Sequence, residues 1–142
     1  MDNARLDLHR RYHEAQTLRK GWPDSEKTTA DYTFAFVQNP LPGATEITAW
    51  EPLADGSEAL RLVVLTESTP NVVSGIYHFH DPTLSSRSLG TFGMLHTIRL
   101  AQTLGKRWAY FGFYVAGCPS LAYKARFKPC EILGTDNVWR RE

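Results

Sequence analysis

The chain has 142 residues, of which 42% are hydrophobic, and this suits one domain of ordinary size with an apolar core. Its formal net charge is +1, so any contact with nucleic acid has to come from a local basic patch. The two cysteines lack CxxC spacing, which argues against a disulfide framework and a four-ligand zinc site. The charged N-terminal stretch and the lack of any apolar run of about 18 residues predict a cytoplasmic protein without signal peptide or membrane span.

The chain opens with two predicted helices. In the first, over residues 3–20, Leu8 and Tyr12 recur at helical spacing, and Leu18 is expected to extend their apolar stripe. Glycine and proline end this helix, and a weaker helix is expected over 24–38. These helices precede a segment with the alternation and turn signals of a sheet.

Three strands of an antiparallel meander are predicted next, over residues 46–53, 59–66 and 72–80. The turn residues at 54–57 favour a hairpin between the first two strands. The second strand is almost continuously apolar, which is typical of a central strand.

The last part is expected to alternate helix and strand. A helix over 87–104 has a broad apolar face, and an aromatic strand over 108–116 follows it. A short helix over 119–127 and a final strand over 131–139 complete the chain. The order is α-α-β-β-β-α-β-α-β, which resembles the GNAT acyltransferase fold, an α/β fold with a mixed sheet. We therefore expect a single domain over 1–142, in which a parallel crossover lies beside the meander and a substrate cleft opens where the two parallel strands separate.

A short motif lies where the third strand leads into a helix, and it consists of Arg87, Gly90 and Phe92. Members of the GNAT fold that use acyl-CoA carry Gln/Arg-x-x-Gly-x-Gly/Ala here, with backbone N–H groups around a pyrophosphate. The local pattern by itself also suits an ordinary helix start, whereas the element order favours a ligand site. Phe92 replaces the small residue, and its ring is expected to crowd a pyrophosphate.

Histidines occur in two spaced pairs. His78 and His80 are two apart on one strand and face the same way, so they are expected to line a polar cleft; no third ligand at metal-binding spacing accompanies them. His9 and His13 are four apart on the first helix. With Arg10, Arg11, Arg19 and Lys20 they are expected to form solvated surface, and the alternative is a basic face for phosphates.

The densest basic and aromatic segment is Tyr123-Lys124-Ala125-Arg126-Phe127-Lys128. Arginine and lysine suit contacts with phosphate or carboxylate groups. The alternative is a solvated last helical turn in which the helix dipole favours cations, and composition alone favours that alternative.

Several short motifs recur along the chain in a fixed order. Their residues are Leu8, Arg11, Tyr12, Tyr77, Asp81, Pro82, Ser88, Leu89, Gly90, Tyr110, Gly112, Phe113, Tyr114, Cys118, Pro119, Tyr123, Lys124, Phe127 and Pro129. Together they resemble the C-terminal, GNAT-like half of the arginyl/leucyl-tRNA–protein transferase family, over nearly the whole chain.

The chain also departs from that family's pattern. His80 stands where the family usually has Tyr, Phe92 replaces an aromatic hydroxyl, and Ser120-Leu121 replaces Lys-Met. The family's Cys-rich N-terminal domain, which is implicated in iron–sulfur or metal binding and in recognising the protein acceptor, is not found in this sequence. We therefore expect a stand-alone chain whose acceptor is a small molecule, a peptide or a protein N-terminus.

The resemblance implies transfer of an amino acid from aminoacyl-tRNA to an amine, with aminoacyl-tRNA as co-substrate and with neither a cofactor nor a metal. This chemistry needs positioning, proton removal from the attacking ammonium and support for the oxyanion. The residues expected to be catalytic are Tyr123 for proton delivery, and His80 and Asp81 for receiving the amine's proton or orienting the amine. The residues expected to bind tRNA or substrate are Tyr77, Arg87, Ser88, Leu89, Gly90, Thr91, Tyr110, Tyr114, Lys124 and Arg126.

Two other functions remain open from the sequence. One is an acyl-CoA-dependent N-acyltransferase, against which Phe92 argues. The other is a non-catalytic binding module, or one subunit of a split transferase with a separate partner subunit. Neither alternative involves a membrane.

Overall fold

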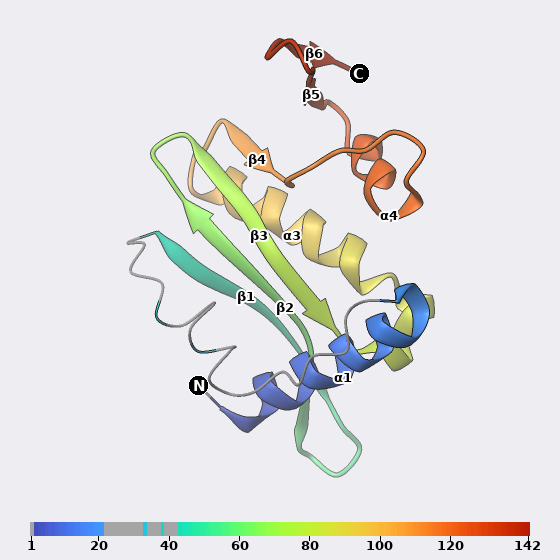
Figure 1. Cartoon of the computed structure of the whole chain (residues 1–142). Helices are drawn as coiled ribbons and strands as arrows, with labels where there is room; N and C mark the ends of the chain where they lie inside the picture. The colour runs from blue at the N-terminus through green and yellow to red at the C-terminus, as the bar shows by residue number, and fades with distance from the viewer. Residues whose placement is uncertain (1, 22–32, 34–37, 39–42) are drawn as a thin grey trace. The chain divides into compact units, whose positions relative to one another are not determined.

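The computed structural model describes residues 2–21, 33, 38 and 43–142 (Figure 1). The chain divides into two compact units, Met1–Tyr110 and Phe111–Glu142. The helix expected over 24–38 lies outside the described residues, apart from two isolated positions. No helix within the described ranges is long and apolar enough to cross a membrane.

The first unit contains a four-stranded mixed sheet in the order β1-β2-β3-β4. Strands β1 (Ala44–Pro52), β2 (Glu58–Ser68) and β3 (Val72–His80) form the antiparallel meander, and β4 (Trp108–Tyr110) pairs parallel to β3. The α/β fold class, the meander and the parallel crossover are therefore confirmed. The β1–β2 turn is also confirmed, with Gly56 at a φ of 84° and Asp55 accepting hydrogen bonds from the backbone and hydroxyl of Ser57.

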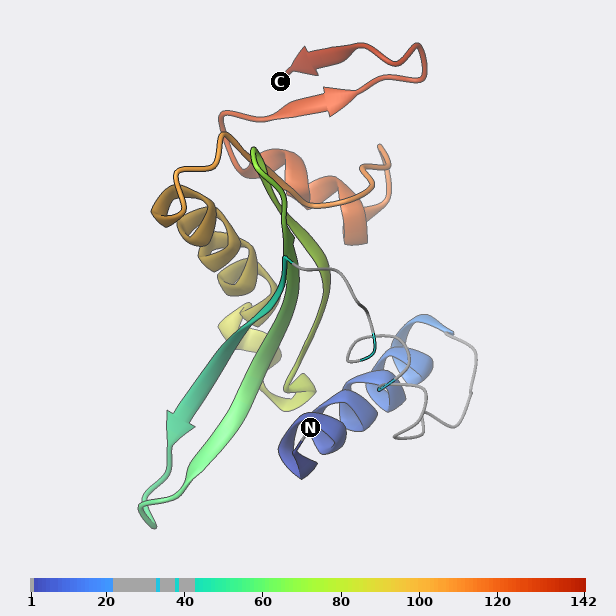
Figure 2. The same ribbon diagram turned by 90° about the vertical axis from the view of Figure 1, so that its left-hand side faces the viewer.

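Helix α1 (Asn3–Lys20) covers one face of this sheet, opposite α3 (Figure 2). Its N-cap is Asp2, whose carboxylate accepts the Arg5 N–H at 3.0 Å. Leu8 and Tyr12 pack into one buried cluster with Phe79 of β3 and with residues of β2. Leu18, expected on the same face, is 88% exposed, so this expectation is wrong. Six residues at about 100° each place it about 120° from Tyr12 around the helix.

Helix α3 (Leu89–Thr103) covers the other face of the sheet and comes closest at Gly93. A Cβ atom on Gly93 would lie 2.8 Å from Cγ2 of Val64 and 3.3 Å from Cδ2 of Leu62. Because side chains alternate along a strand, Leu62 and Val64 face α3 while Val63 faces the α1 cluster.

The start of α3 differs from the expected helix over 87–104. Pro82–Arg87 forms a separate 3₁₀ helix, η2, because Asp81 caps it and Pro82 suits its first turn. Ser88 then takes a left-handed conformation with a φ of 52°, and α3 begins only at Leu89. Arg87 therefore belongs to η2 and not to α3.

The strand expected over 108–116 is also shorter in the structure. It ends at Tyr110, because only Val72–Ser74 of β3 pair with it. Gly112 then has a φ of 72°, which takes the backbone out of the extended conformation.

The second unit begins with a helical segment and ends with a hairpin. Helix α4 (Pro119–Ala122) continues into the 3₁₀ helix η3 (Tyr123–Arg126). The helical segment expected over 119–127 is therefore confirmed. The single strand expected over 131–139 is wrong, since β5 (Glu131–Leu133) and β6 (Trp139–Arg141) pair antiparallel. The chain reverses between them, with Asn137 at a φ of 61°.

Replacing Gly93 with alanine is expected to destabilise the protein by about 1 kcal/mol, because overpacking costs about 1–3 kcal/mol and the gain in helix propensity is about 1 kcal/mol. Gly90→Ala is the matched control, since a methyl group there meets its nearest atom at 3.4 Å, an ordinary contact. Urea denaturation of both variants measures the difference. A Gly93→Ala protein as stable as Gly90→Ala would contradict the close approach of α3 to β2.

Candidate active site

Two histidines at the end of β3 face the first turn of α3. The rings of His78 and His80 stack with their centroids 5.9 Å apart. A Cβ atom on Gly90 would lie 3.4 Å from Nε2 of His78 and 3.9 Å from Cε1 of His80. The expectation that the two histidines face the same way is confirmed, and the structure brings them together with Gly90.

A β-bulge in β3 directs these histidines toward α3. Leu65 pairs with Tyr77, but the next residue, Thr66, pairs with Gly75, so Ile76 is the extra residue. Residues opposite each other in an antiparallel pair point to the same face. His78, opposite Val64, therefore faces α3, whereas Tyr77 faces α1.

The first turn of α3 presents backbone donors next to these imidazoles. Ser88 is exposed and its side chain makes no capping hydrogen bond, although its carbonyl accepts the Phe92 N–H at 3.1 Å. The first-turn N–H groups of a helix have no intrahelical partner, and the helix dipole favours an anion there. Of the expected binding residues in this turn, Leu89 is buried and packs in the core, while Thr91 is exposed.

His80 is a neutral imidazole at pH 7. Burial, and then the charge of His78, lower the pKa of His80 to about 4; Asp81 opposes this shift, and Arg19 and Lys20 add to it. The Nδ1 atom of His80 is buried without a hydrogen-bond partner. A group with so low a pKa is a weak base, so the ring is better suited to orient a ligand by hydrogen bonding than to hold a proton.

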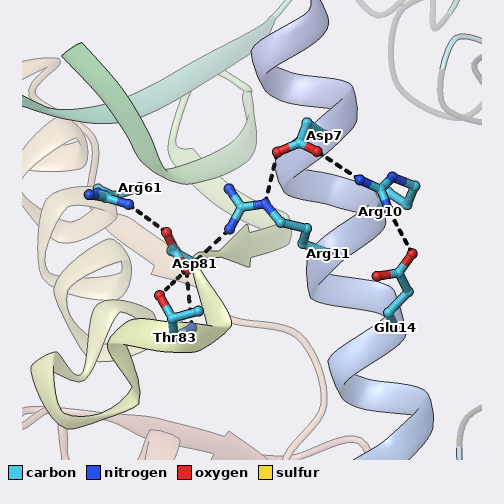
Figure 3. A network of polar contacts seen from close by, with 7 residues as sticks. All are labelled: Asp7, Arg10, Arg11, Glu14, Arg61, Asp81 and Thr83. Atoms are coloured by element: carbon cyan, nitrogen blue, oxygen red, sulfur yellow. Dashed lines mark hydrogen bonds and ion pairs between the residues drawn. The ribbon is translucent and has the colours of Figure 1, made fainter. Parts of the chain in front are cut away.

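Asp81 lies at the centre of a buried ion-pair network (Figure 3). Its side chain is 2% exposed, and its Oδ2 accepts from Nη1 of Arg61 at 2.7 Å. Its Oδ1 accepts from the backbone and hydroxyl of Thr83 at 3.0 and 2.7 Å and lies 3.3 Å from Nη1 of Arg11. Burial by itself raises the pKa of Asp81, but the bonds from Thr83 and Arg61 and the charge of Arg11 outweigh it and bring the pKa to about 2.

The network continues from Arg61 to the 3₁₀ helix η2. Glu51 of β1 binds Arg61 at 2.8 Å and Arg87 at 2.6 Å. These two arginines, Arg87 first, lower the pKa of Glu51. Arg87, expected to bind tRNA or substrate, thus already holds a carboxylate, although half of its side chain stays exposed.

Tyr77 belongs to the α1 side of the sheet. Its hydroxyl lies 2.7 Å from Nε2 of His13, and its ring packs beside Phe79. His9 is only 5% exposed and lies edge-on to Phe79. The expectation that His9 and His13 are solvated is therefore wrong, because both lie on the face of α1 that carries Leu8 and Tyr12.

The remaining expected site residues lie in the second unit, apart from Tyr110, which ends β4 and is 41% exposed. Burial raises the pKa of Tyr123 and lowers the pKa of Lys124. The Lys124 ammonium donates to the Phe113 carbonyl at 3.1 Å, while Arg126 is exposed. A single cleft that joins these residues to the histidines stays a prediction.

Arg61 and Arg11 bind the buried carboxylate of Asp81, but the sequence gives little indication that they do so. Arg61 interrupts the apolar run of β2, and a charge inside such a run is a usable signal for a buried ion pair. Arg11 belongs to the family pattern, but that pattern does not mark it as the partner of a buried carboxylate. Within the part of the chain that the structure describes, no group of three or more His, Cys, Asp or Glu residues could hold a metal ion.

Replacing Asp81 with Asn is expected to lower the free energy of unfolding by about 3 kcal/mol, because Arg61 loses its buried counter-charge. The folded-state pKa of about 2 lies below the ordinary 3.8. The wild type therefore holds this stabilisation above pH 4, and about 2 kcal/mol of it is lost as the pH falls from about 4 to 2.

Urea denaturation between pH 2 and pH 7 measures this loss, with Glu14→Gln, an exposed carboxylate of α1, as the control. The Asp81→Asn protein should lose about 2 kcal/mol less stability between pH 4 and pH 2 than the wild type and the control, because only the share of Asp81 is removed and carboxylates such as Glu51 keep theirs. A parallel loss in all three proteins would contradict the assignment.

Comparisons with known proteins place the chain in a family. The family model described as "Arginine-tRNA-protein transferase, C terminus" matches residues 4–134. The aspartate/glutamate leucyltransferase of Campylobacter jejuni is 30% identical over 100% of this chain and 58% of its own length. The proteins of the same name from Halorhodospira halophila and Pseudomonas fluorescens are 30% and 32% identical, over 100% and 90% of this chain and 57% and 51% of their own lengths. The chain thus spans less than two thirds of these relatives, and it belongs to the arginine-tRNA-protein transferase family, whose C-terminal part it matches.

Proposed function

We propose that the chain transfers an amino acid from aminoacyl-tRNA to an amine. The observation that carries the proposal is the junction of β3 and α3, where two imidazoles meet an uncapped helix start in a chain of this family. The family match runs through both units, which supports one transferase domain over the whole chain.

In the proposed reaction, the amine nitrogen attacks the ester carbonyl of the aminoacyl-tRNA. A C–N bond forms and the C–O bond to the ribose breaks, while the nitrogen loses a proton and the ribose oxygen gains one. The first turn of α3, from Ser88 to Thr91, faces the 3′ end of the tRNA, with its N–H groups toward phosphate or ribose. His80, neutral at pH 7, orients the attacking amine by a hydrogen bond.

Asp81 is proposed as a positioning residue for this site. Its carboxylate is already bound by Arg61, Arg11 and Thr83, and its low pKa makes it a poor base. Both residues were expected to receive the proton of the amine. Because the pKa values of Asp81 and His80 are low, neither residue is proposed as the proton acceptor. Solvent can take the proton from the ammonium before the attack.

The aromatic and basic residues outside the junction are proposed to complete the site. Tyr110 and Tyr114 line the cleft, and Tyr123 delivers the proton to the leaving ribose oxygen. The hydroxyl of Tyr123 is protonated at neutral pH, because the ordinary tyrosine pKa is about 10 and burial raises it further. Lys124 and Arg126 hold a phosphate or an acceptor carboxylate.

The names of the relatives suggest which groups to test first. These relatives are called aspartate/glutamate leucyltransferases, so leucine is the proposed donor amino acid, and an N-terminal Asp or Glu the proposed acceptor. A small-molecule amine is a further proposed acceptor. A separate partner subunit that presents the acceptor is compatible with the same chemistry.

Incubating the protein with radiolabelled leucyl-tRNA and a peptide that begins with Asp is expected to move label to the peptide. Parallel reactions contain arginyl-tRNA, a peptide with a blocked N-terminus, or acetyl-CoA in place of aminoacyl-tRNA. The blocked peptide and acetyl-CoA should give no product. A cell extract is added in a further set to supply other acceptors or a partner. Label that never leaves either tRNA, even with extract, would contradict the proposed function.

A further inference from the structure

Two buried polar side-chain atoms among the described residues have no hydrogen-bond partner. They are Oε1 of Gln16 on α1 and Nδ1 of His80 at the end of β3. Gln16 is only 8% exposed. A buried polar atom left unpaired costs about 1–3 kcal/mol, so such atoms usually have a partner in the functional state.

The two atoms belong to one neighbourhood. The rings of Tyr12 and His80 lie 5.1 Å apart, and Gln16 follows Tyr12 by one turn on the same face of α1. Arg19 and Lys20 follow Gln16 by a further turn, and their charges reach His80. Figure 1 shows α1 running past the end of β3. The face of α1 beside His80 therefore presents an aromatic ring, an amide and then two cations.

The two cations differ from the other arginines of α1. Within the described ranges, Arg19 and Lys20 are exposed and form no ion pair, whereas Arg10 binds Asp7 and Glu14. The helix dipole favours cations in the last turn, which accounts for the position of Arg19 and Lys20. The helix dipole does not account for the unpaired amide of Gln16 on this face of α1, or for the unpaired imidazole of His80 beside it.

The chemistry of these groups defines a ligand. The Gln16 oxygen needs a donor, and the neutral His80 nitrogen can donate or accept. The cations need an anion within a few ångströms of that donor. A ribose with its phosphate offers a hydroxyl and an anion on one small unit. The cations repel an ammonium, so an acceptor amine reaches His80 only after it has lost its proton to solvent.

We propose that Gln16 and His80 bind a ribose 2′-hydroxyl, and Arg19 and Lys20 the adjacent phosphate, at the single-stranded 3′ end of an RNA. This rests on the proposed function and adds the last two turns of α1 to the site. His80 is partly exposed, so rotation of its ring can turn Nδ1 toward a ligand that arrives from the side of the cations.

The test measures binding of the trinucleotide CCA and of its deoxy counterpart by isothermal titration. The wild type is expected to bind the ribonucleotide more tightly.

Gln16→Met, an apolar replacement of similar volume, should remove most of this preference, a loss of about tenfold for one hydrogen bond. Its melting temperature should equal or exceed that of the wild type, because an unpaired buried amide is gone. A merely structural glutamine would lower it.

The double variant Arg19→Ala/Lys20→Ala should weaken binding of both trinucleotides and reduce the dependence of affinity on salt, by a slope of about 0.7 for each phosphate that the protein no longer neutralises. Arg10→Ala, a cation of the same helix that is already paired, is the matched control and should leave binding unchanged.

Three results would overturn the inference. The wild type could bind neither trinucleotide, Gln16→Met could keep the ribose preference, or the double variant could behave like Arg10→Ala. The transfer assay separates this failure from that of the proposed function. If the wild type transfers label, but Gln16→Met and the double variant bind the trinucleotides as tightly as the wild type, only the proposed subsite on α1 is wrong. If the variants bind as expected while no label moves, only the transfer is wrong.

Discussion

One buried carboxylate connects the elements around the candidate site. Asp81 is almost fully removed from water, and a charge in that position is stable only if donors surround it. The donors are Arg11 from α1, Arg61 from β2 and Thr83 from the 3₁₀ helix η2. Moving any of these three elements would remove a donor from the buried carboxylate, so the network holds them together at the point where β3 ends. The next residues lead into α3, whose first turn meets His78 and His80.

The same strand serves the core and the site. Beyond the bulge at Ile76, Tyr77 and Phe79 face α1 and His78 faces α3, while His80, the last residue of the strand, lies near both the first turn of α3 and Tyr12 of α1. Without the extra residue, the two sets would exchange faces, and the histidines would point into the apolar cluster. A neutral, buried His80 is the electrostatic consequence, because the core on one side and the cations of α1 nearby both disfavour its protonated form.

Local patterns predicted most of the elements of the first unit, since the meander, its hairpin turn and the helix after it depend on alternation, turn residues and helical spacing. Patterns failed where contacts between distant residues decide the structure. Gly75 is the one local signal for the bulge at Ile76, since a glycine inside a strand often marks a bulge, but where the extra residue falls depends on how β2 and β3 pair. The early end of β4 follows from the pairing, which stops at Ser74 although β3 continues to His80, and from the change of backbone direction at Gly112. The turn at Asn137 is different, because Asp136 and Asn137 are themselves a local turn signal within the segment predicted as one strand.

Among the predicted site residues, His80 and Gly90 lie side by side in the structure. Asp81 was expected to act on the amine, and its carboxylate is bound by residues of three other elements. Its partners Arg11 and Arg61 are 70 and 20 residues away in the sequence, and only the fold brings them together. Gln16 could not be singled out, since nothing local shows that a polar residue of α1 is buried without a partner.

The most direct test of the account asks whether the 3′ end of aminoacyl-tRNA lies at the junction of β3 and α3. The chain has five histidines, whose side-chain resonances can be assigned by single substitutions. A stable amide analogue of leucyl-tRNA, reduced to its acceptor stem, is titrated into labelled protein. If the 3′ end lies at this junction, the His78 and His80 resonances shift on binding, while that of His96, on the exposed face of α3, stays unchanged. Binding that shifts His96 and leaves His78 and His80 unmoved would contradict it.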